Sequence, residues 1–345
     1  MRRFTKIRAL GLVAALALST LAACGSSDGD SGGKADLVQF KSAIFPGETY
    51  ALDYIADKNG FFADHGVKVS YLSPQSGAAA VQMLAGGQIN GWSTAPAIIY
   101  NAAAQGQPIK LAGLVNGYTA YEVVAGADAK WPVDGSFEEK VKSLKGTTIG
   151  VSGLSAGTDL SLLAALHSAG MSADDVKRIG VGTTLAGLGQ LKAGKIDSYV
   201  EFTGSGARLI EKDGVGRSYL SLYGPDAPAE VDALADLGVA VNADFAAKNP
   251  KAVEGWLAAL DEAREWLIDP KNLDAATKIV ADASYNGDNQ AEVKDSLKAL
   301  AENLRKTGAD FKVDPARVQL QLDVLTRIGA LKKDAGVAPD SVILD

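Results

Sequence analysis

Cysteine and histidine are almost absent from this chain, which holds one cysteine and two histidines in 345 residues. A single cysteine cannot close a disulfide within the chain. The common structural zinc sites need four cysteine or histidine ligands held close together. The two histidines, His65 and His167, are scattered. The sequence therefore predicts no internal disulfide and no zinc site of the common kinds.

Long apolar runs are also missing, apart from one near the N-terminus. Four basic residues precede the uncharged apolar stretch 9–23, which is short for a membrane span and ends in small residues. These features are typical of a secretory signal peptide covering residues 1–23. Its removal takes away four positive charges and no negative ones, so the net charge goes from −7 to −11. Such an acidic protein is not expected to bind nucleic acid.

The residues that close this leader are Leu21, Ala22, Ala23 and Cys24. They resemble the bacterial lipobox, in which the cysteine becomes the first mature residue and carries lipid. We therefore expect Cys24 to be lipidated and to anchor the protein to the outer face of a bacterial cell membrane. Residues 24–35 are rich in glycine and serine and are predicted to be a flexible tether. The alternative is a signal peptide that ends near a cysteine by chance.

From residue 36 the sequence alternates between short β-branched runs and helical patterns. This alternation predicts an α/β fold, with mostly parallel sheets flanked by helices. Ligands of such folds bind at the carboxyl ends of the strands. The candidate ligand-binding residues at these ends are Ser42, Phe45, Ser76, Gly77, Trp92, Ser93 and Thr94.

The stretch from Lys145 to Thr158, KGTTIGVSGLSAGT, carries the clearest local signal. Residues 147–151 read as a buried strand, residues 152–157 as a turn of small residues, and a helix follows. Free N–H groups and the helix dipole at such a helix start favour an anion. The predicted ligand contacts here are Ser155, Ala156, Gly157 and Thr158, and the alternative is a purely structural turn.

The same turn spells G-x-S-x-G, the nucleophile elbow of α/β-hydrolases. That reading needs a histidine after the serine and beyond its helix. His65 lies upstream of Ser155, and His167 lies on the helix that Ser155 begins. Residues 189–195 come close to a phosphate-binding loop, but run from helix to strand, the reverse of that motif. We therefore expect neither an enzyme nor a cofactor.

A partial internal repeat suggests two lobes of related design. Leu84-x-x-Gly87-x-Ile89-Asn90-x-Trp92 is echoed by Leu191-x-x-Gly194-x-Ile196-Asp197-x-Tyr199. Both read as a helix end, a glycine cap and a short strand, although a chance match of turn chemistry is the alternative. We expect lobe 1 at 36–118, lobe 2 at 119–234, and a return to lobe 1 with C-terminal helices at 235–345.

The order of several motifs resembles the solute-binding proteins of ABC importers for sulfonates, taurine, nitrate and thiamine precursors. The matching segments are 56–62, 76–77, 84–90, 144–151, 194–201 and 249–253. The resemblance implies a type II periplasmic-binding-protein fold whose two lobes close over one ligand. Two departures stand out. Asn90 replaces the usual Asp, and Phe202 follows Glu201 where the family often has Pro.

The resemblance implies a monomeric solute-binding lipoprotein that delivers its ligand to a membrane permease. The two helix starts suit a sulfonate or a similar anion. Glu201, if it faces the cleft, would favour an amine. A zwitterion such as an aminosulfonate satisfies both, and a heterocycle stacked on Trp92 or an aromatic acid are the alternatives. A pyrimidine-synthesising enzyme of eukaryotes shares the fold, but it has a cysteine-rich motif, and Cys24 is the sole cysteine here.

Overall fold

The computed structural model describes residues 37–119, 121–182, 184–202, 210–308 and 310–344. The predicted leader, Cys24 and the tether lie outside this part of the chain. Within it, no helix is both long enough and apolar enough to cross a lipid bilayer.

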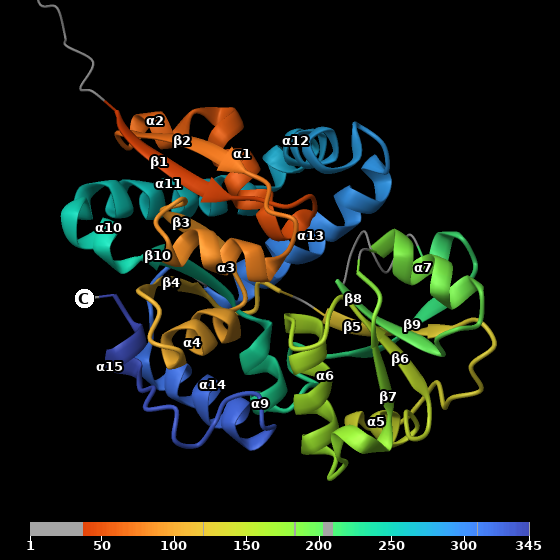
Figure 1. The fold of residues 1–345 in the computed structure, drawn as a ribbon. Helices are drawn as coiled ribbons and strands as arrows, with labels where there is room; N and C mark the ends of the chain where they lie inside the picture. The colour runs from red at the N-terminus through yellow and green to blue at the C-terminus, as the bar shows by residue number, and fades with distance from the viewer. Residues whose placement is uncertain (1–36, 120, 183, 203–209, 309, 345) are drawn as a thin grey trace, which may run out of the picture. The chain divides into compact units, whose positions relative to one another are not determined.

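In the described part of the chain, ten strands form two sheets of five strands each (Figure 1). The first sheet contains β1 (Val38–Ala43), β2 (Val67–Leu72), β3 (Gly91–Thr94), β4 (Ile109–Val115) and β10 (Leu237–Asn242). The second contains β5 (Tyr121–Gly126), β6 (Thr148–Val151), β7 (Lys177–Gly180), β8 (Ser198–Phe202) and β9 (Gly216–Ser221). We call each sheet with its covering helices a lobe.

The strand orders are β2-β1-β3-β10-β4 and β7-β6-β8-β5-β9. In each sheet the strand in fourth place runs antiparallel to both neighbours, and the remaining pairs are parallel. The predicted α/β fold of two mostly parallel sheets is therefore confirmed. Strand β10 returns to the first sheet, so the chain passes between the sheets twice, through residues 116–120 and 222–236. The exact lobe boundaries stay a prediction.

Helices cover the sheets and fill the C-terminal third. The helices before the first crossover are η1 (Glu48–Tyr50), α1 (Ala51–Asn59), α2 (Phe61–Asp64), α3 (Gly77–Ala85) and α4 (Pro96–Ala104). Those up to the second crossover are α5 (Phe137–Lys142), α6 (Gly157–Ser168), η2 (Ala173–Asp175), α7 (Thr184–Lys192), α9 (Ala229–Asp232) and η3 (Ala233–Ala235). The remaining ones are α10 (Ala243–Lys248), α11 (Pro250–Ile268), η4 (Pro270–Asn272), α12 (Leu273–Tyr285), α13 (Gln290–Thr307), α14 (Pro315–Arg327) and α15 (Pro339–Val342).

The first sheet buries an apolar layer on each face. On one face, Phe40 of β1 packs with α1 and with Trp256 of α11. On the other face, α3 and α4 contribute Leu84 and Ile99. A Cβ at Gly91 would lie 2.5 Å from the ring of Trp256, so this strand position has room only for glycine. The C-terminal helices, blue in Figure 1, lie beside this lobe, with α12 against α1 and α14 against α4.

The second sheet is covered in the same way. Val123, Ile149 and Val200 face the layer that holds α5 and α6. On the opposite face, Val124 and Tyr199 pack under α7, where a Cβ at Gly187 would lie 2.5 Å from the Tyr199 ring. Alternation along each strand thus places odd and even residues under different helices.

Two predicted elements differ from the structure. The helix expected over 49–62 begins as η1, and it is interrupted between α1 and α2, because Gly60 takes a left-handed conformation with a φ of 84°. A residue in that conformation ends a helix and turns the chain. The short strand expected over 89–92 lies at Gly91–Thr94 instead.

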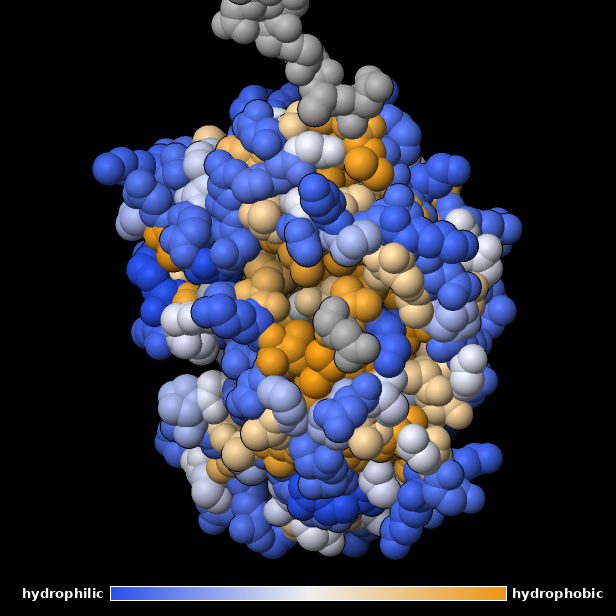
Figure 2. Space-filling view, turned by 90° about the vertical axis from the view of Figure 1, so that its left-hand side faces the viewer, coloured by the Kyte–Doolittle hydropathy of each residue, from blue (hydrophilic) through white to orange (hydrophobic). Residues whose placement is uncertain are grey.

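The surface is mainly hydrophilic on the face that Figure 2 shows, although apolar residues reach the surface in its middle. Large apolar side chains with substantial exposure are few among the described residues. They are Val38, Leu72, Val133, Leu154 and Leu185. Leu154, which is 61% exposed, belongs to the small-residue turn between β6 and α6.

Candidate ligand-binding site

The site is built first from aromatic side chains at the carboxyl ends of β1 and β3. Trp92 of β3 donates its indole N–H to the phenolic oxygen of Tyr50 over 2.9 Å. The ring of Phe45, just after β1, has its centroid 6.0 Å from that of Tyr50 and 6.0 Å from that of Trp92. The predicted residues Phe45 and Trp92 are therefore brought together. Sequence reasoning missed Tyr50, although a tyrosine before a helix that follows a strand end was an available signal.

The start of α3 lies against this aromatic group. A Cβ at Gly77 would lie 3.7 Å from the ring of Trp92, so the two predicted residues Gly77 and Trp92 are neighbours. Ser76 is the N-cap of α3, and its hydroxyl oxygen accepts a hydrogen bond from the N–H of Ala79. This helix start therefore has one of its free N–H groups capped by its own serine.

Ser42, Ser93 and Thr94 are buried under this region. The hydroxyl of Ser42 donates to the carbonyl of Ala43, and that of Ser93 donates to Oδ2 of Asp53 over 3.0 Å. Because strand residues alternate, Ser93 faces the side of α1 while Trp92 faces the side of α3. Burial raises the pKa of Asp53 to about 7, and the hydrogen bond from Ser93 opposes that rise. The hydroxyl of Ser93 is thus a hydrogen-bond donor to the buried carboxyl group of Asp53.

The second lobe contributes the turn between β6 and α6. Ser155 has a φ of 66°, which is unusual for a residue with a side chain, and its N–H donates to Oδ2 of Asp159. Asp159 also pairs with Arg178 over 2.6 Å. The hydroxyl of Thr158 accepts from the N–H of Ser152 over 3.0 Å, so Thr158 fastens the turn to its helix.

Helix α6 begins without a side-chain cap. Its N-cap is Ala156, which has no oxygen to offer to the N–H groups of the first turn. The N-caps of the two helix starts therefore differ, since the side chain of Ser76 caps α3 and the N-cap residue of α6 makes no side-chain hydrogen bond. Of the two predicted anion sites, the start of α6 is the better one.

Aromatic residues of the second lobe border this helix start. The hydroxyl of Tyr121, the first residue of β5, lies 2.6 Å from where a Cβ of Gly157 would be. Tyr121 also meets Phe202, at the end of β8, edge to face with centroids 5.3 Å apart. Phe202 was noted in the sequence only as a departure from the family pattern.

Glu201 lies elsewhere. In the ladder between β5 and β8 it stands opposite Glu122, and by alternation it shares a face with Tyr199, the face that α7 covers. Its Oε1 accepts from the N–H of Phe202 over 2.7 Å. Burial raises the pKa of Tyr199, and the neighbouring Glu201 adds to that rise. Phe202, on the opposite face, is therefore the residue of this strand end that meets Tyr121.

Two small hollows lie among the described residues where the lobes meet. The starts of α4 and α6 line one of about 10 Å³, and Tyr118, Phe202 and α13 line one of about 20 Å³. One water molecule needs about 10–15 Å³. Neither of these two hollows could hold an organic ligand, and a hinge motion of the kind known for such folds would open the space between the lobes.

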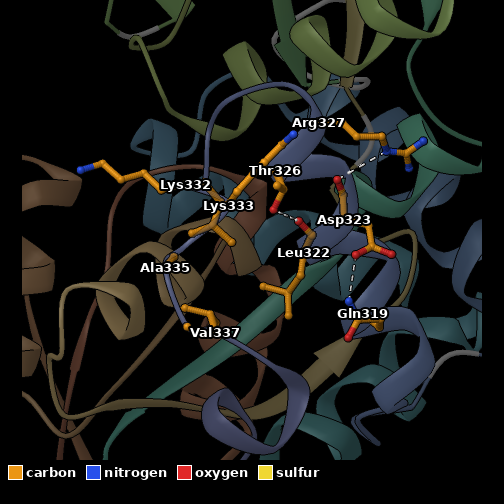
Figure 3. Close-up of a pocket in the computed structure, with 11 residues that line it drawn as sticks. Gln319, Leu322, Asp323, Thr326, Arg327, Lys332, Lys333, Ala335 and Val337 are labelled. Carbon is orange, nitrogen blue, oxygen red and sulfur yellow. Dashed lines mark hydrogen bonds between the residues drawn. The ribbon is translucent and has the colours of Figure 1, made fainter.

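Two larger hollows lie outside the predicted site. One of about 650 Å³ runs along α14 and the chain after it, where Gln319 bonds to Asp323 and Thr326 to the carbonyl of Leu322 (Figure 3). The other, of about 610 Å³, lies at the amino ends of β6 and β8 and the end of β5. Ligands of open α/β sheets bind at the carboxyl ends, and neither hollow contains a predicted ligand residue.

The chain brings no catalytic set to Ser155 within the described residues. His65 pairs with Glu262 over 2.8 Å, and His167 lies 3.9 Å from Glu230, at the far end of α6 from Ser155. The same part of the chain holds no group of three or more histidine, cysteine or acidic residues that could bind a metal ion. The site therefore consists of aromatic surfaces, hydroxyl groups and backbone N–H groups.

Solved structures share this fold. The alkanesulfonate-binding protein of Xanthomonas axonopodis pv. citri, solved with bound MOPS, is 15% identical with a TM-score of 0.70, over 90% of this chain and 98% of that one. The aliphatic sulphonate-binding protein of Escherichia coli is 18% identical with a TM-score of 0.68, over 89% and 97%. The nitrate-binding protein of Synechocystis PCC 6803 is 18% identical with a TM-score of 0.64, over 87% and 83%.

No curated protein matches the sequence. The family model described as NMT1/THI5 like matches residues 49–272, which is more than half of the chain. That range contains Tyr50, the start of α3, Trp92 and the turn before α6. The chain belongs to the NMT1/THI5-like family and has the fold of the periplasmic binding proteins.

Proposed function

We propose that this chain is the extracytoplasmic solute-binding protein of an ABC importer. It captures a small organic solute between its lobes and delivers it, as a monomer, to the permease in the membrane. One observation carries the proposal. The aromatic group of the first lobe, Phe45, Tyr50 and Trp92, and the uncapped start of α6 in the second lobe both lie at strand carboxyl ends, where the lobes meet.

The ligand proposed is a small organic oxyanion, such as a sulfonate, or a zwitterion such as taurine. Backbone N–H groups and the dipole of α6 favour a negative group, and the aromatic side chains would cover an apolar body. The structural relatives that bind alkanesulfonate and nitrate support this class. A thiamine-precursor pyrimidine or another heterocycle stacked on Trp92, or an aromatic acid, is the alternative. The position of Glu201 under α7 does not favour a ligand selected by an amine.

A thermal-shift screen of sulfonates, taurine, nitrate, aromatic acids and pyrimidines, followed by calorimetry on the hits, tests the proposal. Ser76→Ala and Ser155→Ala should each weaken binding about tenfold to a hundredfold if the serine hydroxyls contact a charged group. The two losses should be coupled, because both contacts need the closed state. Normal binding by both variants would contradict the placement of the site. Failure of every compound to bind would count against the function itself.

The proposed anchor is the lipid on Cys24. Cys24→Ser should release the protein into the medium or leave the precursor uncleaved, because the lipid attachment point is lost. The measurement is cell fractionation with mass spectrometry of the N-terminus. Unchanged membrane retention together with normal processing would remove the anchor from the proposal and leave solute binding unaffected.

A further inference from the structure

The structure determines which group donates in the hydrogen bond between Tyr50 and Trp92. Its phenolic oxygen lies 2.9 Å from Nε1 of Trp92. The indole nitrogen can only donate, so Tyr50 accepts in this bond. The phenolic hydrogen of Tyr50 must then point to another acceptor, and no described residue accepts it.

This hydroxyl is buried, since Tyr50 is only 6% exposed. A buried polar group normally finds a partner, because leaving its hydrogen bond unmade in the protein interior is costly. Burial also raises the pKa of Tyr50 well above its ordinary value, so the hydroxyl keeps its proton and remains a donor. Accepting one hydrogen bond polarises it and strengthens the bond that it donates.

The surroundings of Tyr50 belong to the proposed site. Phe45 and Trp92 flank its ring, and the Trp92 ring lies against Gly77 at the start of α3. Tyr121 of the second lobe lies close enough to Tyr50 to contribute to the rise of its pKa. The hydroxyl of Tyr121 touches Gly157, the first residue of the uncapped helix α6. Tyr50 is therefore near the place where the first lobe approaches that helix start.

We propose that Tyr50 is a specificity-determining residue that donates its phenolic hydrogen to an acceptor oxygen of the ligand, and that Trp92 fixes this direction as a positioning residue. The inference rests on the proposed function and narrows its ligand. The bound group carries acceptor oxygens and no donor hydrogen, as a sulfonate or carboxylate does. The uncapped N–H groups of α6 bind the same kind of group from the other lobe.

Two substitutions separate the roles. Tyr50→Phe removes only the hydroxyl, and should weaken binding of an oxyanion about tenfold to a hundredfold. Trp92→Phe keeps an aromatic ring but removes the N–H that fixes Tyr50, so Tyr50 can then accept as well as donate. This variant should lose part of its preference for oxyanions over ammonium compounds. Tyr219→Phe is the matched control, because its hydroxyl bonds to Ser143 in the second lobe, away from the site.

The experiment is calorimetry of wild type and the three variants with ethanesulfonate, taurine, benzoate, ethylammonium and a neutral pyrimidine, with circular dichroism to confirm folding. An oxyanion that binds wild type and Tyr219→Phe equally, but Tyr50→Phe at least tenfold more weakly, supports the inference. If Tyr50→Phe does not fold, the inference is tested instead by whether Trp92→Phe loses part of its preference for oxyanions over ammonium compounds. Equal oxyanion affinity of folded Tyr50→Phe and wild type would overturn it, as would binding of ethylammonium alone, and both leave the proposed function intact. Failure of all five compounds to bind would contradict the proposed function.

Discussion

The carboxylate of Asp236 accepts a hydrogen bond from the backbone N–H of Gly117 over 2.8 Å, and this bond joins the two crossovers between the lobes. Asp236 is fully buried. It also accepts hydrogen bonds from two residues of α14, over 2.8 Å from Nε of Arg317 and over 2.7 Å from Nε2 of Gln321. Burial raises the pKa of Asp236, and the guanidinium of Arg317 opposes that rise. Helix α14 therefore holds both connections on which a hinge motion would turn.

We expect Arg317→Met to destabilise the protein by about 3–5 kcal/mol, because it leaves the buried carboxylate of Asp236 without its counter-charge. Urea unfolding measures the change. Arg327→Met is the control, since Arg327 on the same helix pairs with Glu230 while 46% exposed, and such surface pairs contribute about 1 kcal/mol or less. An equal effect of the two substitutions would show that the buried pair has no special role.

The buried carboxyl of Asp53 should make stability depend on pH. Its pKa is about 7 in the folded protein, against an ordinary value of 3.8 for an aspartate carboxyl group. Below the lower value both states carry the proton. As pH rises, the unfolded chain loses its proton first, so the stability that Asp53 contributes falls until about pH 7 and then stays level. The full change is roughly 4 kcal/mol at most.

Asp53→Asn should remove this dependence, because the amide stays neutral and can still accept from Ser93. The difference in free energy of unfolding between variant and wild type should therefore shift in favour of the variant from pH 4 to pH 8. Urea unfolding at several pH values measures it, with the exposed Asp64→Asn as a control for loss of one acidic group. Parallel pH profiles of Asp53→Asn and wild type would refute the expectation.

Two glycines of one turn offer a matched pair at the site. A Cβ at Gly157 would lie 2.6 Å from the hydroxyl oxygen of Tyr121, whereas one at Gly153 would lie 3.8 Å from its nearest neighbour. Gly157→Ala should displace the buried Tyr121, destabilise the protein by about 1–3 kcal/mol and weaken ligand binding. Gly153→Ala should behave like wild type. Calorimetry measures the change in ligand binding of both variants, and thermal unfolding measures their stability. Equal binding and stability of the two variants would place Tyr121 and Gly157 outside the site.

Local signals in the sequence predicted much of the fold. The strand and helix around the small-residue turn appear at Thr148–Val151 and Gly157–Ser168, because β-branched residues, small residues and a leucine face each favour one local structure. The prediction of one helix over 49–62 was wrong at Gly60, where the apolar pattern continues although the backbone takes a left-handed conformation. A single glycine in a helical pattern does not indicate which backbone conformation it adopts, because glycine takes left-handed and right-handed conformations about equally well.

The site was predicted less completely, for a physical reason. Trp92 and Gly77, which were named separately as candidates from the rule about strand ends, lie beside each other. The bond from Trp92 to Tyr50 joins residues 42 positions apart, and that from Ser93 to Asp53 joins residues 40 apart. Such contacts depend on how α1 packs on the sheet, and periodicity within one segment carries no information about them. The sequence also left open which way Glu201 faces, since its face of β8 depends on the pairing with β5.

The last prediction concerns Ser155, whose left-handed backbone resembles that of a nucleophile elbow. We expect Ser155→Ala to fold normally and to bind ligand about tenfold to a hundredfold more weakly, because alanine keeps the Cβ and loses only the hydroxyl. Ser155→Gly should bind as weakly as the alanine variant, although glycine tolerates this φ better. Wild-type protein should resist labelling by a fluorophosphonate probe, since His167 lies at the other end of α6 and pairs with Glu230. Mass spectrometry after probe treatment measures this. Covalent modification of Ser155 would mean that the turn activates a nucleophile, and the reading of this site as a binding site would then be wrong.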